Sequence, residues 1–485
     1  MDVHTRINPA DLARFADLSE DRNPIHTRPE IARYTHFGQP IVFGVQTVLT
    51  ALEHHLREAP DETGLRLRRL AVKLPQPLYV DEVFVVTATD RSDGSRMLRA
   101  AVGDTTVAQV KLEFGEHARA APPSGSFRAG PVEYHAEPLN RDIAEALPVR
   151  GSLPLGATTS PESLFPACCG ALGAMTVMSI IRLSTLVGME WPGMYSVLSE
   201  FEVNLEPGAA EGGGLDYEVA RVDDRVSMTW IDARSPFISA SVLAMFRPEP
   251  VAQPDYAGIV RRLGGARPYA GKHCLVVGGS RGLGEVAAKL VAAGGGRTTL
   301  TYRSAADRAG AIAEEISQGG GQCATAPLDV LDPTSVSALP AEEDPFDAVM
   351  YFATPHIFRR RVEAFSPTVL ESFMDVYVHA FHRLVARLTG GSKRHLSVLY
   401  PSTVAIDEPV RDLLEYSVAK AAGETLCRNL DRQSRRLDIV IERFPRVQTD
   451  QTNTIATAES ADPVDLLLPV AARLFGIEDR PEMSH

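Results

Sequence analysis

The sequence predicts a doubly wound parallel α/β sheet in the C-terminal part of the chain, preceded by two α+β modules with antiparallel sheets. Strands and helices alternate over residues 274–327, a rhythm typical of parallel sheets with crossover helices. Before that, an apolar helix followed by a run of strands occurs twice. Two Pro- and Gly-rich stretches, residues 118–130 and 248–271, separate these parts as predicted linkers.

The elements follow from hydrophobic periodicity. The first module is predicted to have helices at 9–18 and 40–56 around a turn-rich loop, then strands at 67–74, 80–89, 95–102 and 106–114. The second has a helix at 164–186 and strands at 195–205, 215–222, 226–232 and 238–246. The shared order indicates duplication. The predicted domains are 1–118, 130–248 and 271–485, with a linker at 249–270.

Composition excludes several classes of protein. The net charge of -13, with scattered Lys and Arg, argues against a nucleic-acid surface. Five cysteines without a CxxC pair argue against a disulfide framework. The N-terminus lacks a signal-peptide pattern, and the chain lacks a membrane-length apolar run, so a cytoplasmic protein is expected. The 13 histidines form no ligand cluster, so no metal is expected.

A glycine-rich turn, Gly278-Gly279-Ser280-Arg281-Gly282-Leu283-Gly284, lies between a predicted buried strand and an amphipathic helix. Its glycines permit close approach of the backbone to a pyrophosphate, and the helix N-terminus offers free amides. This predicts dinucleotide binding. About 20 residues on, where an NAD enzyme has an acidic residue, stands Arg303, which with Arg281 favours the 2′-phosphate of NADPH over NADH. Asp329 is a predicted adenine-side contact.

Tyr416 and Lys420 are four residues apart on a predicted helix and share one face. A lysine there can lower the pKa of the tyrosine and hold the ribose, so that the tyrosine exchanges a proton with a carbonyl or alcohol oxygen. Ser402 or Thr403, at a strand end upstream, could hydrogen-bond the same oxygen.

Together these motifs resemble the short-chain dehydrogenase/reductase family over about residues 271–485. The resemblance implies a Rossmann fold with Tyr416 as general acid, Lys420 as its partner and Ser402 or Thr403 as the third member. The family's commonest spacing lands on Thr403, but Ser402 is one residue further and the sequence does not decide. Reductases of this family often dimerise or tetramerise, so a homo-oligomer is expected. The predicted cofactor contacts are Gly278, Ser280, Arg281, Gly282, Leu283, Gly284, Arg303, Asp329, Ala353, Lys420 and Thr449.

The sequence departs from that family at three places. The usual Asn-Asn-Ala-Gly appears as Tyr351-Phe352-Ala353-Thr354, and Pro-Gly after the sixth strand appears as Pro445-Arg446. The helix asparagine that supports a proton relay falls on about Tyr377, near His379 and His382. The relay must therefore differ, running through water or a histidine, and a slow or non-catalytic reductase is also compatible with the sequence.

In the first module, Asp21-Arg22-Asn23-Pro24-Ile25-His26 places a carboxylate and an imidazole five residues apart in a turn. Dehydration of a 3-hydroxyacyl thioester needs a base for the α-proton and an acid for the departing hydroxyl, which such a pair can supply. Backbone amides at the helix that begins near Gly44 can stabilise the enolate.

The surrounding residues 8–115 resemble the MaoC-like, R-specific enoyl hydratase/dehydratase family of hotdog folds. The resemblance implies catalysis by Asp21 and His26, with Asn23 shaping the loop and Gly44 giving an oxyanion amide. The family often has His-Gly at the helix start, where this chain has Phe43-Gly44. The second module looks like another hotdog without the motif, so a non-catalytic partner that lines the acyl pocket is expected.

The two resemblances imply a bifunctional enzyme. An NADPH-dependent 3-oxoacyl-thioester reductase would feed a dehydratase that gives a trans-2-enoyl thioester, carried on acyl carrier protein or coenzyme A, in polyketide or fatty-acid-like synthesis. The alternative is the reverse chemistry, hydration followed by NAD-dependent oxidation, as in β-oxidation. A third possibility, of another class, is a carrier-binding scaffold with decayed sites.

Overall fold

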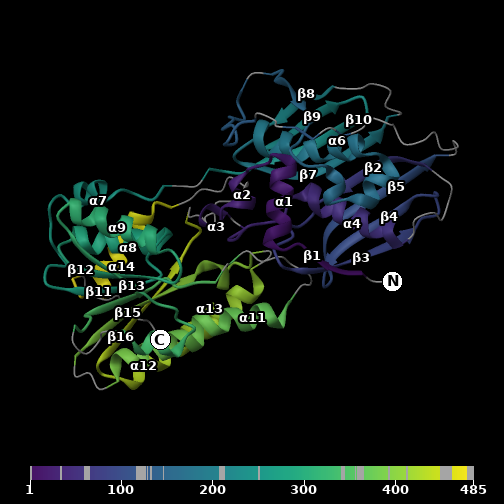
Figure 1. Cartoon of the computed structure of the whole chain (residues 1–485). Helices are drawn as coiled ribbons and strands as arrows, with labels where there is room; N and C mark the ends of the chain where they lie inside the picture. Colours follow the sequence, from purple (N-terminus) through teal and green to yellow (C-terminus); the bar gives the residue numbers. More distant parts are fainter. Residues whose placement is uncertain are drawn as a thin grey trace. The chain divides into compact units, whose positions relative to one another are not determined.

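The structure, a computed structural model, describes residues 3–32, 35, 37–58, 66–115, 127, 129–130, 134–145, 147–206, 213–249, 252–339, 344–355, 357, 365–390, 394–410, 413–447 and 461–477. They form two compact units, one from the chain up to Glu249 and one from the chain after it (Figure 1).

Unit 1 contains one antiparallel sheet, ten-stranded over the described residues, in the order β1-β3-β4-β5-β2-β7-β10-β9-β8-β6. Its halves mirror each other about the pair β2–β7, where Leu70 faces Val203. This symmetry confirms the duplication predicted from the repeated element order. The strands are β1 (Val3–Arg6), β2 (Arg66–Lys73), β3 (Val83–Asp90), β4 (Arg96–Val102), β5 (Thr105–Gly115), β6 (Arg150–Pro154), β7 (Ser196–Leu205), β8 (Gly214–Asp223), β9 (Met228–Arg234) and β10 (Ile238–Phe246).

The edge strands β1 and β6 were not predicted, because both are short and carry charged or turn-forming residues. The predicted helix at 164–186 was wrong as a single helix. It breaks at Gly173, whose φ of 89° is a left-handed conformation that glycine adopts readily. The helices of unit 1 are α1 (Pro9–Ser19), α2 (Pro24–Thr27), α3 (Pro29–Ala32), α4 (Gly44–Glu58), η1 (Pro161–Ser163), α5 (Pro166–Leu172), α6 (Ala174–Thr185) and the π-helical η2 (Leu186–Glu190).

The core of unit 1 lies between the sheet and the helices α4, α5 and α6. In the part of the chain that the structure describes, no single helix is long and apolar enough to cross a membrane. Helix α5 and the stretch from α6 through η2 reach that length only as a pair bent by 117°, and both contribute to this core.

Unit 2 has a parallel sheet, six-stranded over the described residues, in the order β13-β12-β11-β14-β15-β16. Helices α8, α9 and α14 belong to one hydrophobic core and α10 to α13 to another, as a doubly wound sheet requires. This confirms the predicted Rossmann fold. The strands are β11 (His273–Val277), β12 (Arg297–Tyr302), β13 (Gln322–Pro327), β14 (Ala348–Tyr351), β15 (Leu396–Thr403) and β16 (Leu437–Phe444).

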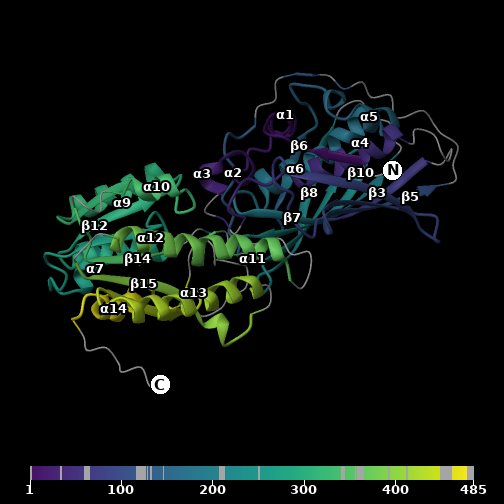
Figure 2. The same cartoon turned by 90° about the horizontal axis from the view of Figure 1, so that it is seen from below.

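The helices of unit 2 connect these strands, and Figure 2 shows α12 and α13 running alongside β14 and β15. Strand order reverses between β11 and β14, which is where such folds bind their ligands. The helices are α7 (Tyr256–Arg262), α8 (Gly282–Ala293), α9 (Ala306–Gln318), α10 (Pro333–Ser337), α11 (Pro367–Met374), the π-helical η3 (Asp375–Ala380), α12 (Phe381–Thr389), η4 (Val404–Ile406), α13 (Leu414–Gln433) and α14 (Pro463–Leu474).

The segment 249–270, predicted as a linker, contains helix α7 and packs onto unit 2. Tyr256 and Ile259 are buried in its core, and the buried Lys289 donates to the carbonyl of Pro254 at 3.3 Å. The helix was not predicted because Pro and Gly residues lie on both sides of it, although its apolar residues Tyr256 and Ile259 are three positions apart.

Candidate active sites

The first candidate site begins with the carboxylate of Asp21, in the loop between α1 and α2. Asp21 is buried, and its Oδ2 accepts a hydrogen bond from Ser184 Oγ at 2.7 Å. Its Oδ1 accepts from the backbone N–H of Asn23 at 3.1 Å. A Cβ on Gly188 would lie 2.2 Å from Oδ1, so only glycine leaves room for this carboxylate. The second repeat therefore contributes directly to the site.

Asn23 fastens the loop to the second repeat. Its Nδ2 donates to the carbonyls of Gly188 at 3.1 Å and Gly193 at 2.9 Å. Its Oδ1 accepts from the N–H of Ile25 and caps the short helix α2. The residue expected to shape the loop is fully buried and does so through contacts on both sides.

His26, on α2, is oriented by the carbonyl of Ile41, which lies 2.7 Å from Nδ1. A carbonyl can only accept, so Nδ1 carries the proton and Nε2 keeps its lone pair. The ring packs against Phe43 with centroids 4.0 Å apart. Phe43, the departure from the family pattern, thus forms one wall of the histidine's environment, and Gly44 begins helix α4 next to it.

Burial moves the two titratable groups in opposite directions. Desolvation raises the pKa of Asp21 to about 7, while hydrogen bonds from Ser184 and Asn23 limit the rise. Desolvation lowers the pKa of His26 to about 4, opposed by the bond to Ile41 and helped by the charge of Arg247. Between pH 4 and 7 the neutral imidazole therefore coexists with a largely protonated carboxyl.

Sequence reasoning missed Ser184 and Gly188, the residues that surround the Asp21 carboxylate. They lie more than 160 positions from Asp21, on α6 and η2. The only signal was a serine and a glycine four apart in an apolar helix, which share a face.

The second candidate site opens with the glycine-rich turn between β11 and α8. Gly278 has a φ of 76°, and a Cβ there would lie 2.9 Å from the backbone nitrogen of Ala353. A Cβ on Gly284 would lie 2.4 Å from the carbonyl oxygen of Gly278. Helix α8 begins at Gly282, so its free amides face this turn. The turn is a bare-backbone cradle of the kind that fits a pyrophosphate.

Two further predicted cofactor contacts, Arg303 and Asp329, lie beyond the carboxyl ends of strands. Arg303 is exposed and directly follows β12. Asp329 follows β13, and its Oδ1 closes a turn by accepting from the N–H of Leu331 at 2.9 Å. Ser280, Arg281 and Leu283 belong to the glycine-rich turn and the start of α8, whereas Thr449 lies outside the described residues.

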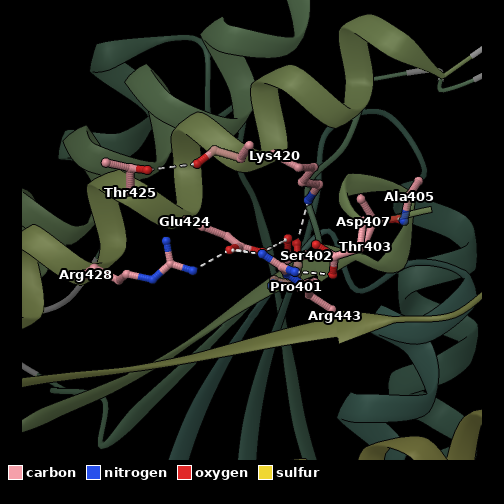
Figure 3. Close-up of polar contacts among 11 residues, drawn as sticks. Pro401, Ser402, Thr403, Ala405, Asp407, Lys420, Glu424, Thr425, Arg428 and Arg443 are labelled. Carbon is pink, nitrogen blue, oxygen red and sulfur yellow. Dashed lines mark hydrogen bonds and ion pairs between the residues drawn. The ribbon is translucent and has the colours of Figure 1, made fainter. Parts of the chain in front are cut away.

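The structure brings Thr403, not Ser402, to Tyr416. The side chain of Thr403 lowers the pKa of Tyr416 and therefore lies beside its hydroxyl. Ser402 Oγ donates instead to Glu424 Oε1 at 2.7 Å, and Arg443 Nε donates to the same oxygen at 2.6 Å (Figure 3). The Ser402 hydroxyl is thus engaged by the buried carboxylate one turn beyond Lys420, which favours Thr403 as the partner of Tyr416.

The expected electrostatic effect of Lys420 on Tyr416 is not what the structure shows. Burial raises the pKa of Tyr416 to about 12, and the side chain of Thr403 opposes the rise. Burial lowers the pKa of Lys420 to about 7, opposed by Cys427 and Glu424. Lys420 Nζ donates to the carbonyl of Pro401 at 2.6 Å (Figure 3) and lies 5.8 Å from the centre of the Tyr416 ring. Desolvation outweighs the lysine's charge here.

The fold and these residues define a double hotdog followed by a Rossmann domain. Residues 2–110 match the family described as MaoC like domain, and residues 272–460 match that described as short chain dehydrogenase. The chain therefore carries a MaoC-like domain at its N-terminus and a short-chain dehydrogenase domain in its C-terminal part.

Individual proteins similar to parts of the chain are also known. A 73-residue stretch is 40% identical to the (R)-specific enoyl-CoA hydratase of Aeromonas caviae, covering 14% of this chain and 53% of that protein. The chain thus spans about half the length of this curated relative. Among solved structures, a short-chain dehydrogenase from Burkholderia cenocepacia in complex with NADP is 23% identical, with a TM-score of 0.39, over 43% of this chain and 91% of that one. A dehydrogenase/reductase from Sinorhizobium meliloti is 24% identical, with a TM-score of 0.39, over 44% and 90%.

Proposed function

We propose that the chain is a bifunctional enzyme that reduces a 3-oxoacyl thioester and dehydrates the resulting 3-hydroxyacyl thioester to a trans-2-enoyl thioester. The observation that supports the proposal is that one chain holds two separate sets of acid–base side chains, Asp21 and His26 in unit 1 and Tyr416 beside Thr403 in unit 2. The product of one reaction is the substrate of the other, which gives a chemical reason for joining them.

In the reductase, the cradle from Gly278 to Gly284 would hold a nicotinamide dinucleotide, which supplies the hydride. Tyr416 stays protonated at neutral pH because burial raises its pKa to about 12, so it can donate its proton to the carbonyl oxygen as that oxygen gains charge. The Thr403 hydroxyl supports the same oxygen, and Lys420 adds positive charge nearby.

The arginines favour NADPH as the cofactor. Arg281 lies at the start of α8 and Arg303 at the end of β12, the positions that face a 2′-phosphate in such folds. Comparison of NADPH and NADH consumption with a 3-oxoacyl-CoA substrate tests the direction of the pathway. Preference for NADPH supports polyketide or fatty-acid-like synthesis; preference for NADH would indicate the reverse, oxidative direction.

In the dehydratase, His26 Nε2 would take the α-proton and the protonated Asp21 carboxyl would give a proton to the departing hydroxyl. The shifted pKa values suit this division, since each group is in the required form between about pH 4 and 7. The amide at Gly44, where α4 begins, would stabilise the enolate oxygen. The acyl thioester is carried by coenzyme A or acyl carrier protein.

The pH profile of dehydration is predicted to be bell-shaped. Activity falls below about pH 4, where His26 becomes protonated, and above about pH 7, where the Asp21 carboxyl loses its proton. Initial rates of 3-hydroxyacyl-CoA dehydration across buffers of constant ionic strength measure both limbs. A rate that keeps rising above pH 8 would show that Asp21 acts as a carboxylate and would reverse the roles.

Residues of the second repeat position Asp21, so Ser184→Ala should change dehydration. Loss of the hydrogen bond raises the pKa of Asp21 further, which moves the alkaline limb to higher pH, and the misplaced carboxyl lowers kcat about tenfold. Ser179→Ala, a buried serine on the same helix whose hydroxyl donates to Met175, is the matched control. If the alkaline limb does not move in Ser184→Ala, Ser184 does not affect the titration of Asp21.

The hydroxyl next to Tyr416 gives a paired prediction for the reductase. Thr403→Val keeps the shape but removes the hydroxyl, and should lower kcat about 10²- to 10³-fold, the range for losing one hydrogen bond to a developing oxyanion. Ser402→Ala should change kcat little, because Ser402 bonds Glu424 rather than Tyr416. NADPH oxidation at saturating substrate measures both, and the opposite order of effects would assign the role to Ser402.

A further inference from the structure

Three tyrosine rings surround the ammonium group of Lys420. Its Nζ lies 3.8 Å from the centre of the Tyr377 ring, 5.1 Å from that of Tyr400 and 5.8 Å from that of Tyr416. The side chain is buried, and its hydrogen bond goes to the carbonyl of Pro401. The shortest of these ring distances is within the range of a strong cation–π contact.

Tyr377 is itself fixed from several directions. Its hydroxyl hydrogen-bonds Thr354 Oγ1 at 2.5 Å, and its ring stacks on Phe373 with an interplanar angle of 5°. Its ring also meets Tyr416 edge-on, with centroids 5.8 Å apart. One buried side chain thus contacts both Tyr416 and Lys420.

Hydrogen bonds from two other tyrosines also hold the backbone around Tyr377 in place. Tyr377 lies in the π-helical segment η3, and its carbonyl accepts from Tyr400 Oη at 3.2 Å. The Tyr351 hydroxyl donates to the neighbouring carbonyl of Val376 at 2.8 Å. A Cβ on Gly423 would lie 1.8 Å from Tyr400 Oη, so that glycine leaves space for the hydroxyl. Tyrosines at 351, 377 and 400 and Gly423 therefore form one interlocked group.

The three residues that depart from the family pattern, Tyr351, Thr354 and Tyr377, are connected by hydrogen bonds in the structure, Tyr351 through the carbonyl of Val376. A tyrosine in place of the helix asparagine needs a partner for its hydroxyl, and Thr354 supplies one. The residue whose ring faces Lys420 is thereby held in a single orientation. Because Thr354 provides the partner that Tyr377 requires, the two departures compensate each other and do not indicate decay of the site.

We propose that the ring of Tyr377 is a positioning element of the reductase, which holds the Lys420 ammonium through a cation–π contact and keeps it beside Tyr416. The proposal rests on the reductase function proposed above. Tyr377 acts through Lys420 and Tyr416, and its ring rather than its hydroxyl is the part required.

A ring that stabilises the ammonium raises the pKa of Lys420, against burial, which lowers it to about 7. Removing the ring should therefore lower the pKa of Lys420 further. Glu424 also acts on this pKa, but its carboxylate is bound by Arg443 and Arg428. The titratable or charged groups that face Lys420 are Tyr377 on η3, Tyr400 on β15, and Tyr416, Glu424 and Cys427 on α13.

The test compares Tyr377→Phe, which keeps the ring, with Tyr377→Leu, which removes it. The chain has only six lysines, so Lys420 can be followed directly by NMR of ¹³Cε-labelled lysine in the full-length protein without cofactor, with Lys420→Arg giving the assignment. We expect Tyr377→Phe to titrate like the wild type and Tyr377→Leu to titrate at lower pH. Reductase kcat/KM should fall about tenfold or more in Tyr377→Leu only, with the alkaline limb of its pH profile shifted down.

Lys289, which is buried and paired with Glu285 and Glu315, is the internal control for folding, and its ¹³Cε chemical shift should be the same in every variant. If Tyr377→Leu does not fold, Tyr377→Met replaces it as the ring-free variant. The proposal would be overturned if Lys420 titrates as in the wild type and kcat/KM is unchanged in the ring-free variant. It would also be overturned if Tyr377→Phe loses as much kcat/KM as the ring-free variant. If the wild type reduces no 3-oxoacyl thioester, the reductase function fails, while the Lys420 titration still decides whether the ring holds the ammonium.

Discussion

Tyr416→Phe is expected to abolish most NADPH-dependent reduction of a 3-oxoacyl thioester, lowering kcat about 10²- to 10⁴-fold, the usual range for loss of a general acid. Phenylalanine keeps the ring contacts with Phe373 and Tyr377, so the change isolates the proton donor. The pKa of Tyr416, raised to about 12, means that the wild type holds this proton throughout the working pH range. Stopped-flow NADPH oxidation with saturating 3-oxoacyl-CoA measures the effect.

Dehydration by the same Tyr416→Phe sample should be unchanged, because the first site belongs to a different compact unit. Tyr269→Phe, a buried tyrosine of unit 2 whose ring packs on Phe475, is a matched control and should reduce at the wild-type rate. Equal rates in Tyr416→Phe and wild type would refute Tyr416 as the acid.

Asp21→Asn is expected to have the complementary effect, lowering dehydration about 10²- to 10⁴-fold while reduction continues. The amide can keep the hydrogen bonds with Ser184 and the N–H of Asn23, so the loop should stay in place. What it lacks is the acidic proton that the raised pKa keeps on Asp21 below about pH 7. The loss of 3-hydroxyacyl-CoA, followed at pH 6, measures the change.

Asp17→Asn, an exposed aspartate on the preceding helix α1, serves as the control and should dehydrate normally. Full dehydration activity in Asp21→Asn would remove Asp21 from the mechanism. A parallel loss in Asp17→Asn would show that the effect is one of net charge or stability.

The sequence predicted what depends on local pattern. Period-two alternation located most strands of both halves, and the order of elements alone indicated the duplication that the β2–β7 pairing joins. It missed the break at Gly173, since an apolar helix pattern continues on both sides of it. It also missed that Tyr256 and Ile259 pack into unit 2, because proline and glycine dominate the surrounding segment.

Site residues could be predicted from the sequence where they lie close together in one motif. Asp21 and His26 lie within one six-residue segment, and Tyr416 and Lys420 share one helix face. Contacts between distant segments were not predictable, such as Ser184 with Asp21 or Thr354 with Tyr377. The sign of the shift at Tyr416 was also missed, because it depends on burial, which only the packed structure reveals.

Product analysis in one vessel shows whether one chain carries out the two acid–base reactions in sequence. Wild type, Tyr416→Phe and Asp21→Asn are each incubated with a 3-oxoacyl-CoA and NADPH, and the thioesters are identified by mass spectrometry, with the acyl-carrier-protein form in parallel. We expect the enoyl thioester from wild type, accumulated 3-hydroxyacyl thioester from Asp21→Asn and unchanged substrate from Tyr416→Phe. Enoyl product from Asp21→Asn, or no reduced product from wild type on either carrier, would contradict the proposed function.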